Sequence, residues 1–330
     1  MSTALGRELL HGCDDEDAGA AFTTYLNYLE HLSILVHQLH GQDRPEIGVY
    51  AATQALPDVV STKSRRVPDL DAARVQNHLR IAWLREARIH SLGELWDCQP
   101  ELLPGTPTDA YYAVYHGAQA YLAATGSQQY RDHAAVLKAL ANIVFQRRVF
   151  PQPWSIACTG LPTDGCAEYK GLPAGVAADA CHNLVRPSCD TSWSTLCLAL
   201  RTTRSRQLDR AKADWKRRSK KRRISSAQSA QLADALMPTT LFDFIWRLRV
   251  RTDYRDVDAF LVGLASQKQA EDFLNSLLSL LTCTLTVFET LVISQGHAPL
   301  LQAAATKFAG SVDPAFSASL TSRPWFTGET

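Results

Sequence analysis

The segment Leu248-Arg-Val-Arg-Thr-Asp-Tyr254 combines residue types that could act on a phosphate ester. Arg249 carries a permanent positive charge and could stabilise the charge that develops on a phosphorane. Asp253 could accept a proton, but it lies four residues after Arg249 on one helical face, so an ion pair between them is the alternative. Tyr254 has an ordinary pKa of about 10, so at neutral pH it is a poor base and would instead orient the substrate or donate a proton.

A histidine that could move protons near neutral pH lies in a second stretch, Asp109-Ala-Tyr-Tyr-Ala-Val-Tyr-His-Gly-Ala-Gln-Ala-Tyr-Leu-Ala-Ala-Thr-Gly126. If this stretch is a helix that packs beside Arg249, then His116, Arg249 and Tyr254 form a composite catalytic site. In the alternative interpretation, the tyrosines of the stretch are core residues, and His116 is an interior histidine whose hydrogen bonds are satisfied.

Together these two stretches resemble the HEPN family of small helical-bundle domains. The first matches the family's early YYAxYHAAxALLxxxG helix, and the second is similar to its later R-x-x-x-D-Y segment, which leads into the last helix. The resemblance implies a four-helix up-and-down bundle that dimerises, so we expect a homo-oligomer. It also implies that the protein binds RNA or nucleotide phosphates, either as a metal-independent ribonuclease in toxin–antitoxin or antiviral defence systems or as an inactive member. An antitoxin or another protein is the partner that the resemblance implies.

The sequence departs from the nuclease members of that family at one position. Nuclease members carry R-x4-6-H, and their arginine and histidine come from two protomers. Arg249 occupies the arginine position here, but Tyr254 stands five residues later, so the resemblance leaves catalysis open. A literal R-x4-H spacing does occur at Arg85 and His90, but it lies on a different predicted helix and we interpret it as accidental.

Basic residues are concentrated in residues 201–223, where twelve Lys and Arg stand against Asp209 and Asp214, a local charge of +10. The rest of the chain has 22 basic and 31 acidic side chains, so the net charge of +1 hides a basic element on an acidic body. We expect this element to bind nucleic-acid phosphates without sequence preference. The alternative is an inactive dimerising scaffold whose basic segment binds an acidic protein partner. The residues expected to bind nucleic acid are Arg206, Arg210, Lys216, Arg217, Lys220, Lys221, Arg222, Arg223, Arg247 and Arg251.

A row of four arginines lies near the end of the predicted helix that carries the arginine–tyrosine segment. Such charges repel unless anions lie among them. The acidic side chains of Asp253, Asp256 and Asp258 would be sufficient, and a phosphate of RNA or of a nucleotide is the alternative. The row consists of Arg247, Arg249, Arg251 and Arg255.

Five of the eight cysteines lie between Cys158 and Cys197, at spacings of x7, x14, x7 and x7. Structural zinc sites usually bring two thiolates together on a tight turn, as in C-x2-C, and no such pair occurs here. We therefore expect free thiols, no metal and no cofactor. A zinc site that includes Cys181 and His182 is the weaker alternative.

The composition is that of a globular protein, with 46% hydrophobic and 20% charged residues. The acidic start, which includes Asp14–Asp17, does not resemble a signal peptide, so we expect a cytoplasmic protein. The apolar stretch at 273–293 contains Asn275 and Glu289. We therefore interpret it as a buried core helix and expect no membrane partner.

Apolar residues recur at helical spacing in most of the chain, and alternating strand patterns are missing, so we expect an all-α fold. The fold would be a four-helix-bundle (HEPN-like) core with extra N-terminal helices and an irregular insertion. Thr108 or Asp109 would cap one helix, and Thr240 with Asp243 would form a capping box. Helices are predicted at 20–40, 69–96, 110–124, 130–149, 192–236, 241–254 and 270–294, and no regular period is seen at 45–68.

We divide the chain into five parts on this basis. They are an N-terminal helical region (1–100), a discontinuous HEPN-like bundle (101–150 and 237–294), a cysteine-containing irregular insertion (151–200), a basic helical segment (201–236) and a C-terminal tail (295–330) with one short helix that frays.

Overall fold

The computed structural model describes residues 15–62, 71–94, 100–127, 129–163, 165–176, 178, 191–254, 267–312 and 314–328. It is mainly helical, which confirms the predicted all-α character, with one small sheet. The elements are α2 (Asp15–His40), α3 (Pro45–Gln54), α4 (Pro57–Thr62), α5 (Ala72–Glu94), the 3-10 helix η1 (Pro100–Gly105), α6 (Thr106–Ala124), α7 (His133–Gln146), β1 (Ala157–Gly160), β2 (Ala167–Lys170), α8 (Ser192–Ser219), α9 (Ser226–Asp234), β3 (Thr239–Thr240), α10 (Leu241–Tyr254), α12 (Gln267–Val292), the π-helical turn η3 (Ile293–His297), α13 (Ala298–Ala309), α14 (Pro314–Thr321) and α15 (Pro324–Thr327).

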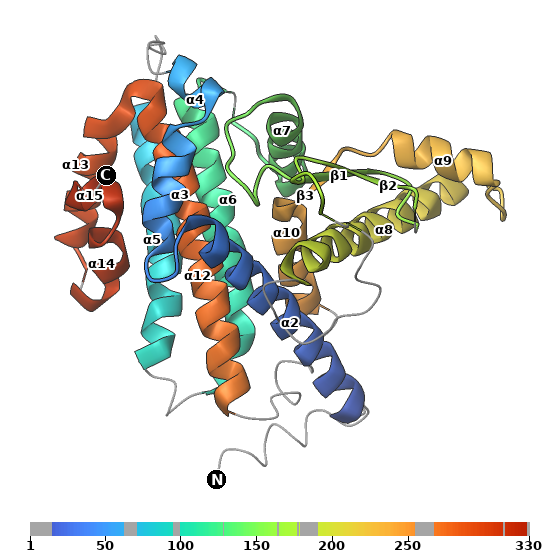
Figure 1. Ribbon diagram of the computed structural model, residues 1–330, viewed down its shortest axis with the longest axis horizontal. Coiled ribbons are helices and arrows are strands. Elements are labelled where there is room, and N and C mark those ends of the chain that lie inside the picture. The colour runs from blue at the N-terminus through green and yellow to red at the C-terminus, as the bar shows by residue number, and fades with distance from the viewer. Residues whose placement is uncertain are drawn as a thin grey trace.

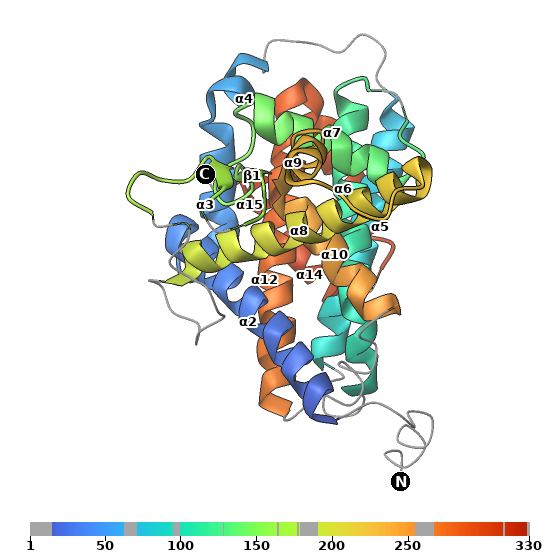
Figure 2. The same ribbon diagram turned by 90° about the vertical axis from the view of Figure 1, so that its right-hand side faces the viewer.

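The body of the protein is built around three long helices, α5, α6 and α12, which lie side by side (Figure 1). Helices α2 and α3 pack against α12, and α13 and α14 cover α5 on the opposite side from the small sheet. Helices α8 and α9 extend from the body as an arm, with the sheet at its base (Figures 1 and 2). Helix α5, which we assigned to a separate N-terminal region, is therefore a direct neighbour of the helix that carries His116.

Helix α12 is the central element of the core. In its most apolar part, 72% of the helix is buried inside the protein, which confirms the prediction of a core helix at 273–293. Its polar side chains form hydrogen bonds with residues from other segments of the chain. Trp154 donates to the Thr284 hydroxyl at 2.9 Å, and Trp83 donates to the Glu289 carboxylate at 2.8 Å. Such pairing makes burial of polar groups in a core helix tolerable.

The C-terminal segment was predicted to be a tail with one short helix that frays, and this prediction is wrong for residues 298–327. They form α13, α14 and α15, and the segment is held by a buried ion network. Arg323 is fully buried and donates to both carboxylate oxygens of Glu86 at 2.8 Å and to Glu289 at 3.1 Å. Trp325 also donates to Glu289, at 2.8 Å. No local pattern could show that this arginine has partners on α5 and α12.

Two further helices occupy a region for which no regular period was predicted. Helices α3 and α4 begin at Pro45 and Pro57, because proline fits the first turn of a helix, where no intrahelical partner is needed for its nitrogen. The predicted cap at Thr108 or Asp109 is also wrong, since α6 already begins at Thr106. The predicted interaction of Thr240 with Asp243 is present, because the backbone N–H and the hydroxyl of Thr240 both donate to the Asp243 carboxylate, at 2.8 and 2.9 Å.

Strands β1 and β2 lie in the predicted irregular insertion, and β3 joins them from residues 239–240. The strand order of the sheet is β2-β1-β3, with antiparallel pairing throughout. Arg204 of α8 ties it to the arm. Its guanidinium donates to the carbonyls of Gly160 at 2.7 Å, Ala233 at 2.8 Å and Met237 at 3.0 Å. Arg204 thus joins β1 to the end of α9 and the following loop.

Candidate functional site

The least buried side of α6 carries a group of aromatic rings. Positions 111, 112 and 115 lie on one side of the helix because they are one and three or four residues apart. His133, the first residue of α7, packs among them, with its ring centre 4.6 Å from that of Tyr115. Its Nδ1 lies 2.7 Å from the Tyr111 hydroxyl. We call Tyr111, Tyr112, Tyr115, His116, His133, His78, Arg85 and Arg249 the aromatic–histidine cluster.

Arg249 enters this cluster from α10. Its guanidinium carbon lies 5.4 Å from the centre of the Tyr112 ring and 5.8 Å from that of Tyr111. Both distances are within the range of a cation–π contact. Burial and then the charge of Arg249 lower the pKa of His133, so the neutral imidazole of His133 is favoured beside the guanidinium. The two stretches that carry the HEPN resemblance therefore meet in space.

His116 lies further from Arg249, at the α5 side of the cluster. Its Nδ1 is 2.9 Å from Nδ1 of His78, so one ring donates a hydrogen bond and the other accepts it. Burial is the main reason that the pKa of His116 is lowered to about 4, and the charges of His78, Arg85 and His133 add to the effect. A neutral imidazole at pH 7 can accept a proton, although a group with so low a pKa is a weak base.

Arg85 closes the cluster on the α5 side. It forms an ion pair of 2.5 Å with Asp109 and lies 5.5 Å from the centre of the Tyr112 ring. Arg85 and Arg249 thus both contact Tyr112, which is half-buried. The nearby His90 interacts electrostatically with the buried Glu86.

The composite site expected from the sequence is only partly assembled. His116 and Arg249 belong to one cluster, but the tyrosine rings and His133 lie between them. The side chains of Asp253, Tyr254 and Arg251 lie outside the described residues. The sequence analysis did not identify His133 and Arg85 as members of the site. The short turn between the two predicted helices at 110–124 and 130–149 was the available signal that His133 lies close to the tyrosines.

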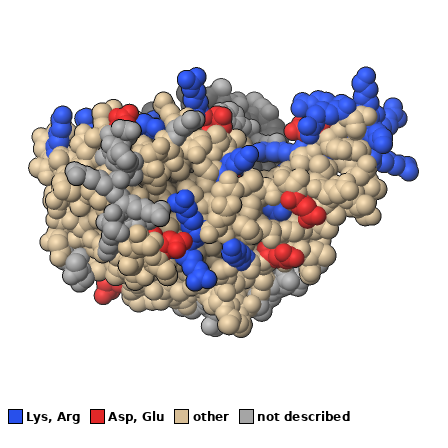
Figure 3. All heavy atoms as spheres, turned by 90° about the horizontal axis from the view of Figure 1, so that it is seen from above, with Lys and Arg blue, Asp and Glu red and all other residues tan. Residues whose placement is uncertain are grey.

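The predicted basic run divides into a buried and an exposed part. Arg201 and Arg204, with 8% and 1% of their surfaces exposed, belong to the body, which corrects the assignment of the whole run to one charged surface. We call the remainder, residues 206–223, the basic hairpin. Figure 3 shows Lys and Arg side chains gathered at the end of the molecule formed by the arm. The exposed members are Arg206, Arg210, Lys216, Arg217, Arg218, Lys220, Lys221, Arg222 and Arg223.

Helix α10 lies between the basic hairpin and the aromatic–histidine cluster. On one side, Arg210 of the hairpin lies 5.1 Å from the centre of the Trp246 ring, and Arg247 donates to the Thr203 hydroxyl of α8 at 3.2 Å. On its other side, Arg249 contacts α6. Arg247 and Arg249 of the predicted row of arginines therefore contact different helices, α8 and α6. The side chains of Arg251 and Arg255 lie outside the described residues.

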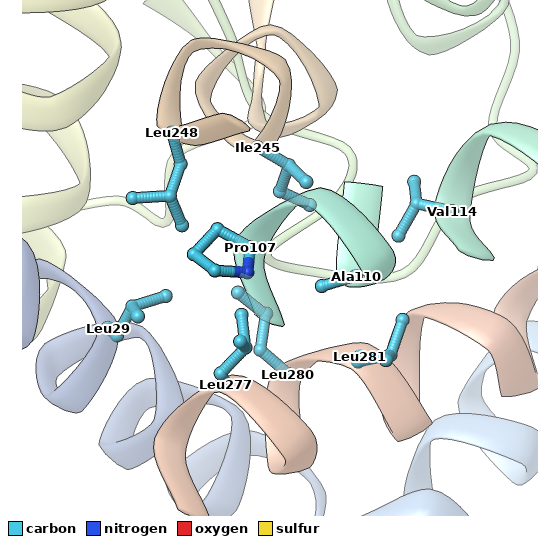
Figure 4. Close-up of a pocket in the computed structure, with 9 residues that line it drawn as sticks. All are labelled: Leu29, Pro107, Ala110, Val114, Ile245, Leu248, Leu277, Leu280 and Leu281. Carbon is cyan, nitrogen blue, oxygen red and sulfur yellow. The ribbon is translucent and has the colours of Figure 1, made fainter. Parts of the chain in front are cut away.

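An apolar cavity lies where α2, α6, α10 and α12 meet (Figure 4). Leu29, Ile245 and Leu277 are among the side chains that line it. Its volume of about 10 Å³ is close to that of a single water molecule, so we interpret it as a packing defect and not as a ligand site.

The cysteine region contains a buried thiol at Cys158, whose pKa burial raises to about 11, and another buried thiol at Cys197. The Cys158 thiol is therefore protonated at neutral pH and is a poor metal ligand. Cys181, His182 and Cys189 lie outside the described residues. Within the described part of the chain, no group of three or more His, Cys, Asp or Glu could hold a metal ion.

No protein-family model matches the sequence, and comparisons with curated proteins and with solved structures found no match.

Proposed function

We propose that this protein binds RNA, with the basic hairpin as the contact for the phosphate backbone. The observation that carries the proposal is the exposure of most of this hairpin, whose sequence has ten Lys and Arg and two acidic residues, Asp209 and Asp214. One of these acids is already used, since Asp214 pairs with Arg217 at 3.0 Å. Uncompensated like charges repel each other, and a polyanion relieves that repulsion while its own counterions are released.

The aromatic–histidine cluster supports single-stranded RNA as the form that is bound. Unpaired bases stack on tyrosine rings and on the planes of guanidinium groups. Tyr112 and Tyr115 are half-buried, so their rings are held in place and still reach solvent. Because α10 contacts both the hairpin and the cluster, one strand could follow the hairpin and place a base near Tyr112.

We further propose that the cluster cleaves RNA without a metal, in keeping with the HEPN resemblance. Two observations support this second function: Arg249 of one resembling stretch contacts Tyr112 of the other, and the neutral form of His133 is favoured beside Arg249. Arg249 would stabilise the phosphorane, His116 or Asp253 would move protons, and Tyr254 would orient the substrate. His133 is the histidine that packs against the tyrosine rings that Arg249 contacts. A role in defence or in a toxin–antitoxin pair, with an oligomer and a protein partner, belongs to the same proposal and to the resemblance alone.

RNA binding is tested with a labelled single-stranded RNA at about 50 mM and about 200 mM salt. Each phosphate contact contributes about 0.7 to the slope of log affinity against log salt. The variant K220Q/K221Q/R222Q should therefore lower the slope by up to about 2. The matched control, K138Q/R148Q/K307Q, removes three exposed charges elsewhere and should leave the slope unchanged. Equal effects of the two variants, or an affinity that does not respond to salt, would overturn the proposal.

A competition experiment distinguishes RNA binding from the rival function, a scaffold that binds an acidic protein. Polyglutamate carries negative charge but neither phosphates nor bases. It should displace the RNA only weakly if bases stack on the tyrosines of the cluster. Displacement as effective as by unlabelled RNA of equal charge would favour the scaffold.

Cleavage is tested with the same RNA in EDTA. Arg249→Ala should abolish the cleavage, and the matched control Arg148→Ala should keep it, because Arg148 is an exposed arginine outside the cluster and the hairpin. Intact RNA with the unmodified protein across several substrates would reject the nuclease role and leave RNA binding as the function.

A further inference from the structure

The loop between α8 and α9 presents a serine two residues after a pair of adjacent arginines. Helix α8 ends at Ser219, Lys220 takes a left-handed conformation with φ of 57°, and α9 begins at Ser226. Between them, residues 220–225 are neither helix nor strand, and Arg222, Arg223 and Ser225 are exposed. Ser225 itself has an extended backbone, with φ of −71° and ψ of 162°.

This arrangement has the chemistry of a substrate for a basophilic protein kinase. An acidic groove on such a kinase binds guanidinium groups that precede the acceptor serine, and the acceptor segment must be exposed and extended to enter the active site. Arg222 and Arg223 stand three and two residues before Ser225. We propose that Ser225 is a phosphorylation site, modified by a basophilic protein kinase with ATP as the phosphoryl donor.

In the proposed step, Oγ of Ser225 attacks the γ-phosphorus of ATP. A new P–O bond forms as the bond between this phosphorus and the β–γ bridging oxygen breaks, and ADP leaves. The hydroxyl proton passes to the catalytic carboxylate of the kinase and then to solvent.

The neighbouring serines are poorer acceptors. Ser219 is in the last turn of α8, is half-buried, and its hydroxyl accepts a hydrogen bond of 3.3 Å from the Lys221 backbone. Ser226 is already part of α9, so its backbone is helical and not extended. Among these three, only Ser225 combines exposure with a backbone outside both helices.

Phosphorylation at this position is compatible with the fold. The Ser225 hydroxyl caps α9 through long hydrogen bonds, accepting from the Gln228 N–H at 3.2 Å and donating to the Gln228 side chain at 3.3 Å. Phosphate oxygens can accept from the same N–H groups, and negative charge is favourable at a helix N-terminus. The effect of the modification is therefore electrostatic, and it falls on Arg222 and Arg223 in the basic hairpin.

The consequence for RNA rests on the proposed function. A phosphoserine carries about −1.5 to −2 charge at pH 7, and Ser225 lies two residues after the end of the hairpin that is proposed to contact the phosphate backbone. It should lower the slope of log affinity against log salt by about 1 to 1.4, since each contact contributes about 0.7. Ser225 would thus set how strongly the hairpin holds RNA.

The site is tested on the full chain with the catalytic subunit of cyclic-AMP-dependent protein kinase and ATP labelled in its γ-phosphate. The unmodified protein and the matched controls Ser219→Ala and Ser226→Ala should take up label, and Ser225→Ala should lose nearly all of it. R222Q/R223Q should be labelled much more slowly than the unmodified protein. Label that persists in Ser225→Ala, or no label in the unmodified protein, overturns the site.

RNA binding by the phosphorylated and the mock-treated protein then tests the consequence. A lower salt slope after phosphorylation, and no change for Ser225→Ala under the same treatment, supports regulation of the hairpin. An unchanged slope with Ser225 fully labelled overturns the regulation. If the mock-treated protein does not bind RNA, the proposed function fails, and the labelling result alone decides the modification site.

Discussion

The guanidinium of Arg249 lies 5.4 Å from the centre of the Tyr112 ring, although the small sheet and the whole basic hairpin separate the two residues along the chain. This contact brings a permanent positive charge to a half-buried aromatic surface with histidines nearby. It is the feature of the cluster on which the proposed chemistry depends.

Replacing Arg249 by alanine should lower the free energy of unfolding by about 1 kcal/mol, because a cation–π contact with two partly buried rings is lost. Arg249→Lys should keep part of that stability but not the planar contact. Denaturant unfolding measures both. Since a loss of about 1 kcal/mol leaves most domains folded, the expected loss of RNA cleavage in Arg249→Ala would reflect chemistry. A loss of cleavage that matches the loss of folded protein would contradict this.

The lowered pKa of His116 predicts an acid-sensitive fold. The folded protein binds a proton at His116 only near pH 4, whereas the unfolded chain binds it near 6.5. As the pH falls, the unfolded state therefore gains this proton first. The contribution of the uncharged His116 to the free energy of unfolding is complete above about pH 6.5 and is lost as the pH falls toward 4. The free energy of unfolding should decrease less steeply over this range in His116→Gln than in the unmodified protein.

Burial raises the pKa of Asp243 to about 6, so the folded state gains this proton before the unfolded state does. Asp243 therefore increases the free energy of unfolding as the pH falls, opposite to the effect of His116. Asp243 is present in both proteins of that comparison, so its contribution cancels in the difference. Identical pH profiles for the unmodified protein and His116→Gln would refute the role of His116.

Removing Arg323 should destabilise the protein strongly. Arg323→Met leaves Glu86 and Glu289 buried without their cation, and breaking such a pair costs about 3–5 kcal/mol. The matched control is Arg217→Met, which removes an exposed ion pair with Asp214 and should cost about 1 kcal/mol or less. Chemical denaturation compares the two. Similar small losses would mean that the C-terminal helices contribute little to stability.

The contact between α6 and α12 is sensitive to one methyl group. A Cβ at Gly117 would lie 3.0 Å from Cδ2 of Leu285 and 3.1 Å from Cδ2 of Phe288, closer than ordinary van der Waals contact. Gly117→Ala should lower the free energy of unfolding by about 1 kcal/mol, because overpacking outweighs the better helix propensity of alanine. Gly105→Ala is the control, since a Cβ there meets no atom within 4 Å. Equal stability of both variants would contradict the close packing.

Local patterns in the sequence determined most of the helices. The apolar periodicity located α2, α5, α6, α7 and α12, and the residues around Thr240 and Asp243 correctly predicted the start of α10. These features depend on residues within one or two turns of each other, so a single sequence contains the information. The regions 45–62 and 298–327 were missed because their short helices are stabilised mainly by contacts with distant elements.

Tertiary structure alone decided the roles of individual charged residues. Arg204 and Arg222 look alike in the basic run, but the buried Arg204 donates to three backbone carbonyls and Arg222 is exposed. Arg323 lies near the end of the described chain, and only the folded protein brings Glu86 and Glu289 to it. The physical reason is that a charged side chain takes its role from the groups that replace its water, and those groups come from segments far away in the sequence.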